Sequence, residues 1–323
     1  MCTAITHQNG DFYFGRTLDL EDPVGGQIVI TPRNLPLFFR YARPLFRHHA
    51  IIGMARVESG YPLYFDAANE QGLCIAGLDF SGWAHYGCGN GSDQVCHFEL
   101  IPWLLGQCAT VEEAKALLDR IHLTEDAFSP ELPSAELHWL IADRQQALTV
   151  EATGEGIRVY PNPAGVLTNN PPFDQMMFSL NRYLNLTSQE PENRFSSVLD
   201  LKPTSHGMGA MGLPGDLSSQ SRFVRAAFVK LNSACGETEE ENVGQFFHMM
   251  DTVSQTRGCS ITAEGKYEHT VYTSCCNADR GVYYYTTYEN RQITAVDLRK
   301  EDLDGRELIC YPRINQLQIH RQN

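Results

Sequence analysis

One residue near the start of the chain combines a type and a position that could do covalent chemistry. The sequence begins Met1-Cys2-Thr3, and removal of the initiator methionine before a small residue leaves a cysteine with both a thiol and a free α-amine. An α-amine titrates near ~7.7–8.0 and a free thiol near ~8.5, so at neutral pH the amine can accept the thiol proton and later deliver it to a leaving group. Nucleophile and base then share one residue. Position alone does not separate this interpretation from a chance placement of one among ten cysteines, so the surrounding elements must decide.

The residues that follow predict a hairpin, which would fix Cys2 at one end of a sheet. Asn9-Gly10 is the strongest short-range signal for a two-residue type I′ turn, and strand-like segments flank it at 2–7 and 11–17. If this turn sets the register, Cys2 lies opposite Thr17.

Two charged residues of the returning segment fall close to Cys2 in this arrangement. Arg16 is a neighbour in the pairing, and Asp19 lies just beyond the strand end. A guanidinium near a thiol stabilises the thiolate, and a carboxylate can hold an α-ammonium group. The alternative is an exposed ion pair at the end of a strand, which is common and contributes little free energy.

Two polar residues in the second half of the chain are further candidates. Asn169 follows a short apolar segment and precedes Pro171-Pro172, so its amide is held in a fixed turn and could donate to an oxyanion; otherwise it is a turn asparagine. Arg222 falls in the first turn of a predicted helix, where a cation faces the positive end of the helix dipole at a cost of about 0.3–1 kcal/mol. It therefore needs an acidic or polar partner elsewhere, unless its side chain reaches solvent.

The composition excludes several classes of partner. A net charge of −14 and a pI of about 5.2 leave no basic stripe for nucleic acid or an anionic membrane surface. There is neither an apolar run of about 18 residues nor a signal peptide, which predicts a cytoplasmic protein with reduced cysteines. The sequence lacks C-x-x-C, H-E-x-x-H, Walker A and G-x-S-x-G patterns, so we expect neither a metal nor a cofactor.

The pattern of elements favours packed, mostly antiparallel sheets covered by helices, because hairpins are many and strand–helix–strand alternations are few. Further strands are expected at 27–31, 50–57, 73–78, 137–142, 147–152, 156–160, 269–274, 281–287 and 291–297. Helices are expected near 97–108, 111–120, 173–185, 222–233 and 239–254. Since no repeat or long linker appears, we predict one domain over 1–323, with loops at 82–95, 124–135 and 188–221 that shape a site.

Several segments match one protein family in the same order along the whole chain. They are Met-Cys-Thr at 1–3, Phe-Gly-Arg-Thr-Leu-Asp at 14–19, Asn-Glu-Gln-Gly-Leu at 69–73, Ala-Gly-Leu at 76–78, Leu-Thr-Asn-Asn-Pro at 167–171, Leu-Pro-Gly-Asp at 213–216, Ser-Arg-Phe-Val-Arg at 221–225 and Tyr-Tyr-Tyr-Thr-Thr-Tyr-Glu-Asn at 283–290. The chain thus resembles the choloylglycine hydrolase family, which contains conjugated bile salt hydrolases and penicillin V acylases.

The resemblance implies a fold, a reaction and a set of site residues. The fold is an αββα sandwich of two mostly antiparallel sheets, and the reaction is hydrolysis of a linear amide through an acyl-enzyme on the N-terminal cysteine. The residues carried over by motif are Cys2 as nucleophile with its freed amine as base after Met1 is removed, Arg16 and Asp19 as tuning and orienting residues, Asn169 as an oxyanion-hole side chain, and Arg222 as a brace of the polar network. The resemblance also suggests a homotetramer.

The residue after Ala-Gly-Leu departs from the family pattern. In many members it gives its backbone N–H to the oxyanion; bile salt hydrolases typically have Asn there and penicillin V acylases Tyr, whereas this chain has Asp79. The backbone can still donate, but a carboxylate beside the site would repel an anionic leaving group. Because the flanking sequence is closer to the bile salt hydrolases, we predict deconjugation of glycine- or taurine-conjugated bile salts. A penicillin V acylase or another N-acyl amino acid amidase is the alternative, and a non-catalytic binder of amphipathic acids is a third.

Overall fold

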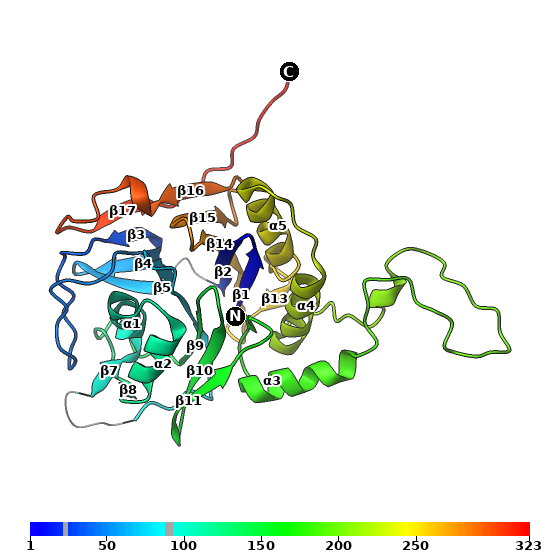
Figure 1. The fold of residues 1–323 in the computed structure, drawn as a ribbon, viewed down its shortest axis with the longest axis horizontal. Helices are drawn as coiled ribbons and strands as arrows, with labels where there is room; N and C mark the ends of the chain where they lie inside the picture. Colours follow the sequence, from blue (N-terminus) through cyan, green and yellow to red (C-terminus); the bar gives the residue numbers. More distant parts are fainter. Residues whose placement is uncertain (22–24, 88–92) are drawn as a thin grey trace.

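Two antiparallel sheets form the centre of the computed structural model, which describes residues 1–21, 25–87 and 93–323 (Figure 1). The first sheet runs in the order β12 (Val166–Leu167), β1 (Cys2–Asn9), β2 (Asp11–Leu20), β14 (Tyr267–Asn277), β15 (Val282–Thr287) and β16 (Thr294–Asp297), with β13 (Ser260–Ile261) paired to β14. The second runs in the order β11 (Gly156–Pro161), β10 (Ala147–Thr153), β9 (Leu137–Ala142), β6 (Cys74–Asp79), β5 (Tyr61–Asn69), β4 (Ile51–Glu58), β3 (Gln27–Thr31) and β17 (Ile309–Pro312). A short parallel pair, β7 (Gln94–Cys96) and β8 (His122–Thr124), lies outside both sheets.

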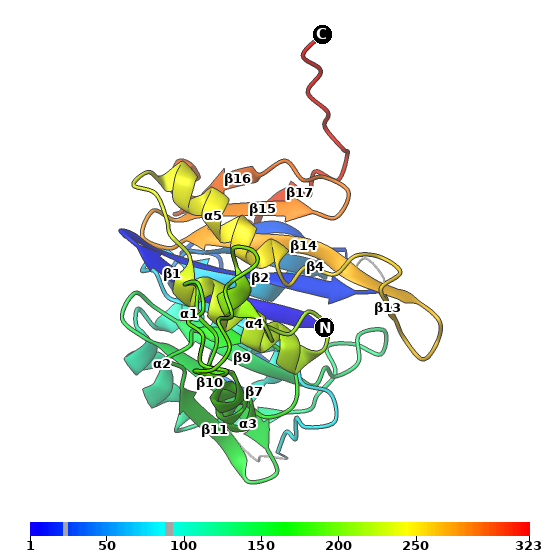
Figure 2. The same cartoon turned by 90° about the vertical axis from the view of Figure 1, so that its right-hand side faces the viewer.

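Helices cover the outer face of each sheet and complete four layers (Figures 1 and 2). On the first sheet, α4 (Ser219–Asn232) packs on β1, and α5 (Glu239–Asp251) packs on β2 and β14. On the second, α1 (Leu100–Gln107) packs on β4, β5 and β6 and is followed by α2 (Val111–Leu118). A fifth helix, α3 (Phe173–Ser179), contacts α4. The predicted αββα fold class is confirmed.

The facing sides of the two sheets share one apolar core. Buried side chains of both sheets belong to it, among them Ile5 and Tyr272 from the first and Ile52 and Leu140 from the second. A separate apolar cluster, which includes Trp139, fills the space between the second sheet and α1. Central strands are therefore buried on both faces and read as continuous apolar runs in the sequence.

Most of the expected elements are present, and one long strand was missed. The strands predicted at 27–31 and 137–142 match β3 and β9, and each of the five predicted helical segments contains a helix. The missed strand, β5, lies between β4 and β6. It contains Pro62 and Asp66, residue types that are rare inside strands, and its burial in the centre of the sheet outweighs those local preferences.

The register of the first hairpin differs from the prediction by one residue. Cys2 pairs with Leu18, because Gly10 alone, at φ +66°, forms the tip of the turn. The side chain of Asn9 donates to the Gly236 carbonyl, before α5, and to Asn242 Oδ1, within α5, and these bonds keep Asn9 in the strand and out of the turn. A shift of one residue turns every side chain to the other face of a sheet. In the observed register Arg16 therefore lies on the same face as Cys2, whereas the predicted register would have placed it on the opposite face.

Two of the predicted long loops are described, and the third only in part. The loop expected at 82–95 includes 88–92, which lie outside the described residues. Most of the segment predicted at 188–221 belongs to an arm, here residues 184–216, that extends from the body between α3 and α4 (Figure 1). The predicted end of this loop was wrong, because residues 219–221 begin α4. Over the described ranges, every helix is too short or too polar to cross a membrane.

Candidate active site

Cys2 occupies the first position of β1, between the two sheets, and is only 2 % exposed. The short strand β12 pairs with β1, with Leu167 opposite Ala4, so the turn after β12 arrives beside Cys2. Asn169 lies in this turn, and the backbone N–H of Cys2 donates to its Oδ1 at 2.8 Å. Pairing of a two-residue strand thus brings together two groups that are 167 residues apart in the chain.

The Asn169 side chain also joins the two sheets. Its Nδ2 donates at 2.8 Å to the backbone carbonyl of Asp79, the last residue of β6. Its backbone N–H donates at 2.9 Å to the hydroxyl of Ser219, the first residue of α4. These bonds fix the orientation of the amide, with Oδ1 toward Cys2 and Nδ2 toward Asp79. Because Nδ2 carries two hydrogens, its second N–H is available for a further acceptor.

Arg222 is completely buried in α4 and binds the same groups. Its Nη2 donates to Asn169 Oδ1 at 2.7 Å, and its Nη1 donates to the Thr3 hydroxyl at 2.6 Å and to the Cys2 carbonyl. These oxygens are the polar partners that a cation in the first turn of a helix requires. Burial lowers the pKa of Arg222, an effect opposed by the negative charges of Asp19 and Cys2.

Arg16 is buried against the second sheet. Its Nη1 donates to the carbonyls of Phe65 and Gly77, and its Nε donates to a carbonyl of its own strand. Nη2 has no hydrogen-bond partner among the described residues. Burial acts to lower the pKa of Arg16, but negative charge on Cys2 and then on nearby groups such as Asp66 holds that pKa above its usual value. Carbonyl oxygens therefore hold the guanidinium in place, and its charge stays directed at the Cys2 end of the interior.

Asp19 is fully buried near the end of β2. Its carboxylate accepts hydrogen bonds from Thr270 Oγ1 at 2.6 Å and Thr17 Oγ1 at 3.2 Å. Burial raises the pKa of Asp19, and the charges of Arg222 and the chain terminus oppose that rise. The terminal ammonium, here that of Met1, donates to the backbone carbonyl of Asp19 at 2.7 Å. The contact expected between the Asp19 carboxylate and the α-amine of Cys2 stays a prediction, because the terminal amine in this structure belongs to Met1.

Glu268, in β14, is a contact of the chain terminus that the sequence did not reveal. Its carboxylate pairs with the ammonium group of Met1 and accepts a hydrogen bond from Ser260 at 3.2 Å. No local pattern distinguishes this residue from the other 38 of the 39 acidic residues in the chain. Its position follows only from the pairing of β14 with β2.

Asp66, in the missed strand β5, is a second buried carboxylate that sequence reasoning overlooked. It accepts hydrogen bonds from Tyr272 at 2.5 Å, Tyr283 at 2.7 Å and Ser274 at 2.9 Å. Burial raises its pKa, and the charge of Arg16 acts in the opposite direction. The Tyr-rich segment at 283–290 was the available signal, because buried tyrosines need polar partners.

Asp79 reaches the site through its main chain. Its carbonyl accepts from Asn169, while its carboxylate accepts a hydrogen bond at 2.5 Å from the Ser81 hydroxyl on the partly exposed side of the strand end. Among the described residues, no cation forms an ion pair with Asp79, and Arg222 makes its hydrogen bonds elsewhere.

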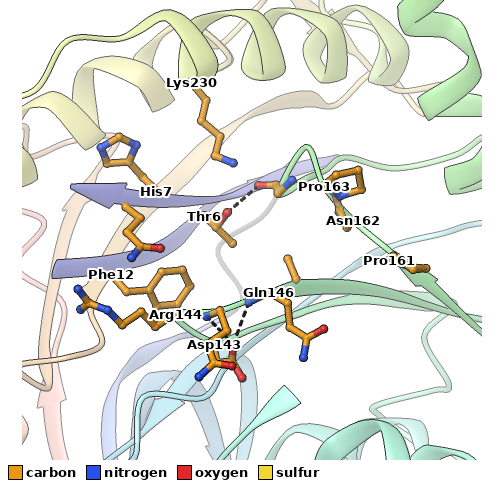
Figure 3. A pocket seen from close by; sticks show the side chains of 14 residues that line it. Thr6, His7, Phe12, Asp143, Arg144, Gln146, Pro161, Asn162, Pro163 and Lys230 are labelled. Carbon is orange, nitrogen blue, oxygen red and sulfur yellow. Dashed lines mark hydrogen bonds between the residues drawn. The ribbon is translucent and has the colours of Figure 1, made fainter. Parts of the chain in front are cut away.

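The far end of β1 borders a hollow with different chemistry (Figure 3). This cavity of about 420 Å³ is lined by Thr6, His7, Gln146, Asn162 and Lys230, among others. Lys230 Nζ donates to the Ala164 carbonyl at 2.6 Å, and burial lowers the pKa of Lys230 to about 8. Five residues of extended strand, roughly 16 Å, separate His7 from Cys2. The cavity is therefore not part of the candidate site. In the part of the chain that is described, no three metal-ligating side chains converge.

Comparison with known proteins gives a consistent relationship. The family model for linear amide C–N hydrolases, choloylglycine hydrolase family, matches residues 2–311. The bile salt hydrolase/transferase of Lactiplantibacillus plantarum is 50 % identical over 324 residues, covering 100 % of both chains. The bile salt hydrolase/transferase of Clostridium perfringens is 35 % identical over 330 residues, again covering 100 % of both.

Solved structures show the same similarity. A conjugated bile acid hydrolase from Clostridium perfringens superposes with a TM-score of 0.92 at 34 % identity, covering 100 % of each chain. A penicillin V acylase from Agrobacterium tumefaciens superposes with a TM-score of 0.72 at 20 % identity, covering 94 % of this chain and 88 % of the other. The second likeness supports the fold alone.

Proposed function

The chain belongs to the choloylglycine hydrolase family of linear amide C–N hydrolases, and from this premise we propose that it deconjugates glycine- or taurine-conjugated bile salts with Cys2 as nucleophile. The observation that carries the proposal is the convergence of Cys2, Asn169 and Asp79 through two hydrogen bonds of 2.8 Å at the junction of the two sheets.

The first step is attack by the Cys2 thiol on the amide carbonyl carbon. Once Met1 is removed, the nitrogen that now donates to Asn169 Oδ1 becomes the free α-amine, which is held next to its own side chain. The amine accepts the thiol proton, sulfur bonds to the carbonyl carbon, and the amine then protonates the leaving nitrogen as the C–N bond breaks. Water attacks the thioester with the same base, which releases the acid and restores the thiol.

The negative charge that develops on the substrate oxygen needs preorganised donors. The second N–H of Asn169 Nδ2 and the backbone N–H of Asp79 fill this role in the proposal, since the bond between Nδ2 and the Asp79 carbonyl already places the two groups together. Arg222 keeps the Asn169 amide in the donating orientation by occupying Oδ1. Arg16 favours the thiolate by its charge, and Asp19 favours a protonated amine.

The choice of substrate rests on the relatives. Full-length identity of 50 % to a bile salt hydrolase/transferase favours conjugated bile salts over penicillin V, because the acylase structure is only 20 % identical. Hydrolysis of penicillin V or another N-acyl amino acid is the alternative, because Asp79 is neither the Asn typical of bile salt hydrolases nor the Tyr typical of the acylases. A non-catalytic binder of amphipathic acids would keep the pocket without using the α-amine.

We also propose that the protein forms a homotetramer and is located in the cytoplasm. The arm of residues 184–216 supports assembly, because it exposes several large apolar side chains, namely Leu184, Phe195, Val198, Leu199, Leu201 and Met211. Side chains of this kind on a projecting segment are typical of subunit contacts. Light scattering of the full chain and of a variant with polar replacements in the arm would test it.

Two measurements test the proposed reaction. Intact mass must show the loss of Met1, since a retained Met1 would leave Cys2 without a free amine. Release of glycine or taurine from conjugated bile salts is then compared with release of phenoxyacetate from penicillin V. Faster release from bile salts is expected; faster release from penicillin V would transfer the proposal to the acylases, and no release of either would favour the binder.

A further inference from the structure

A cationic cavity lies close to the candidate site and has no role in the reaction proposed above. Its volume is about 370 Å³, and it opens between the ends of β14 and β15 and the segment after β17. The charged residues that line it are Arg257, Lys266, Arg313, Glu21 and Glu289. Three cations against two carboxylates make this wall positive in a chain whose net charge is −14.

Strand β14 lies between the cavity and the candidate site, and its successive side chains point in turn to one and to the other. Tyr267, His269 and Val271 line the cavity. The residues between them face the site: Glu268 pairs with the terminal ammonium, and Thr270 donates to Asp19 at 2.6 Å. Because successive side chains of a strand point to opposite faces, one strand separates the cavity from the chain terminus.

Most of the cavity's polar groups already have partners. Arg257 pairs with Glu289 at 2.9 Å and lies over the ring of Tyr288, 4.7 Å from its centroid. His269 Nε2 is 3.2 Å from the Arg257 guanidinium, and its ring packs edge-on against Tyr288. These groups form a rigid wall of rings and guanidinium.

Arg313 is the exception. Its Nε is shielded from solvent and has no hydrogen-bond partner among the described residues, where no carboxylate pairs with the side chain either. Burial lowers the pKa of Arg313, opposed by the phenols of Tyr272, Tyr285 and Tyr283. Arg313 is partly buried, and its shielded Nε–H without an acceptor is destabilising. The fork of N–H groups matches the oxygens of a carboxylate, sulfonate or phosphate.

We propose that this cavity is a binding site for a small oxyanion, with Arg313 as its principal ligand and Arg257 as a second cation in the wall. The ligand is a carboxylate, sulfonate or phosphate group small enough for the cavity. It is either a separate anion or the charged end of the substrate's amine, and only the second source rests on the proposed function.

Binding is tested on the full chain with inorganic phosphate as the probe, at constant ionic strength. Millimolar phosphate should raise the Tm of the wild type along a saturating curve, as expected for a ligand that binds only the folded state. Arg313→Gln should lose the saturating component while Arg306→Gln, which changes an exposed arginine on the other side of β17, keeps it. Because Arg313→Gln also removes the shielded Nε–H that lacks an acceptor, its Tm without phosphate should equal or exceed that of the wild type.

Results of three kinds would overturn the proposal. One is an equal phosphate dependence in Arg313→Gln and the wild type, which would reveal a general salt effect. Another is no saturating dependence in the wild type by either Tm or titration calorimetry. The last is a Tm that responds to protein concentration and not to phosphate, which would mean that a second copy of the chain supplies the anion. If Arg313→Gln fails to fold, Arg313→Lys keeps the charge but not the fork, and at least tenfold weaker phosphate binding is expected.

Kinetics then distinguish the two sources of the oxyanion. If the charged end of the substrate binds here, Arg313→Gln raises KM for a glycine conjugate at least tenfold and leaves KM for the uncharged primary amide of the same acid unchanged. Phosphate then competes with the conjugate. If the anion is separate, neither KM changes while the phosphate-dependent Tm shift is still lost. Either result supports the site, and since phosphate binding needs no turnover, it can be established even where bile salt hydrolysis fails.

Discussion

Two thiols lie near opposite ends of β1 in different surroundings. Cys235 Sγ is 3.1 Å from Nε2 of His7, so it has the imidazole partner that many reactive cysteines use. Cys2 has no such partner among the described residues; the charges of Arg16 and Arg222 act on it instead. Burial raises the pKa of Cys235 and lowers that of His7, so both shifts favour the neutral pair. We therefore expect the histidine contact not to make Cys235 reactive, and the terminal position among cations to make Cys2 reactive.

Two cations of helix α4, Arg222 and Lys230, also differ in their surroundings. Arg222, near its start, donates four hydrogen bonds to oxygens that include the Cys2 carbonyl and Asn169 Oδ1. Lys230, two turns later, donates one hydrogen bond to a carbonyl beside an open cavity (Figure 3). The first cation is part of a hydrogen-bond network, and the second is partly buried with one hydrogen bond.

The largest expected effect tests the contrast between the thiols. Cys2→Ser retains the α-amine but replaces the thiol by a hydroxyl of much higher pKa, so kcat should fall by roughly 10³-fold or more with an unchanged Tm. Cys235→Ser is the matched control and should keep kcat within about twofold. Iodoacetamide inactivation should follow labelling of the N-terminal peptide. Loss of activity in Cys235→Ser, or retention in Cys2→Ser, would reverse the assignment.

The next effect compares two buried asparagines. Asn169→Ala removes a proposed oxyanion donor and should lower kcat by roughly 10²–10³-fold with little change in KM. Asn162, at the far end, is equally buried and holds Thr149, Val166 and Gly165 by hydrogen bonds. Asn162→Ala should lower Tm and leave kcat nearly unchanged. A change in KM alone for Asn169→Ala would make Asn169 a substrate-binding residue.

The sequence predicted the features that depend on local patterns and missed those that depend on contacts between distant parts of the chain. Motif positions predicted Cys2, Asn169 and Arg222, which hydrogen bonds bring together in the structure. Strand and helix patterns predicted packed antiparallel sheets covered by helices, and the family resemblance implied the αββα layers. The register of the hairpin was wrong, because the bonds of Asn9 to a segment more than 200 residues away decide where the turn begins. Glu268 was missed for the same reason: its contact with the terminus depends on strand pairing across the chain. Local patterns specify elements, whereas long-range pairing specifies which side chains meet.

A smaller effect concerns the carboxylate of Asp79, which forms no ion pair with a cation among the described residues. Two unit charges ~5 Å apart at an effective dielectric of ~20 repel by about 3 kcal/mol, which corresponds to roughly two orders of magnitude in rate. Asp79→Asn should therefore raise kcat/KM for conjugated bile salts by up to about 10²-fold, and for penicillin V by less. Parallel kinetics on both substrates measure the difference. Equal changes would mean that the carboxylate, bonded to Ser81, faces away from the leaving group.

The smallest effect tests whether the end of β1 near His7 and Lys230 contributes to stability and not to catalysis. Lys230 has a pKa of about 8 in the folded chain against a usual value of 10.5, so between these pH values the unfolded state binds more protons. Stability therefore rises as pH increases from about 8 toward 10.5, and below pH 8 the charged, buried lysine destabilises the fold by its full amount. Lys230→Met removes the charge. Its Tm at pH 7 should exceed that of the wild type, the difference should shrink toward pH 10.5, and kcat at pH 7 should stay within about twofold.

Arg222→Met, at the other end of the same helix, should instead abolish most activity, because the Asn169 side chain loses the hydrogen bond that holds its orientation. If Lys230→Met lowered kcat as strongly as Arg222→Met, the two ends of β1 would be coupled, and the separation between a catalytic end and a structural end would be wrong.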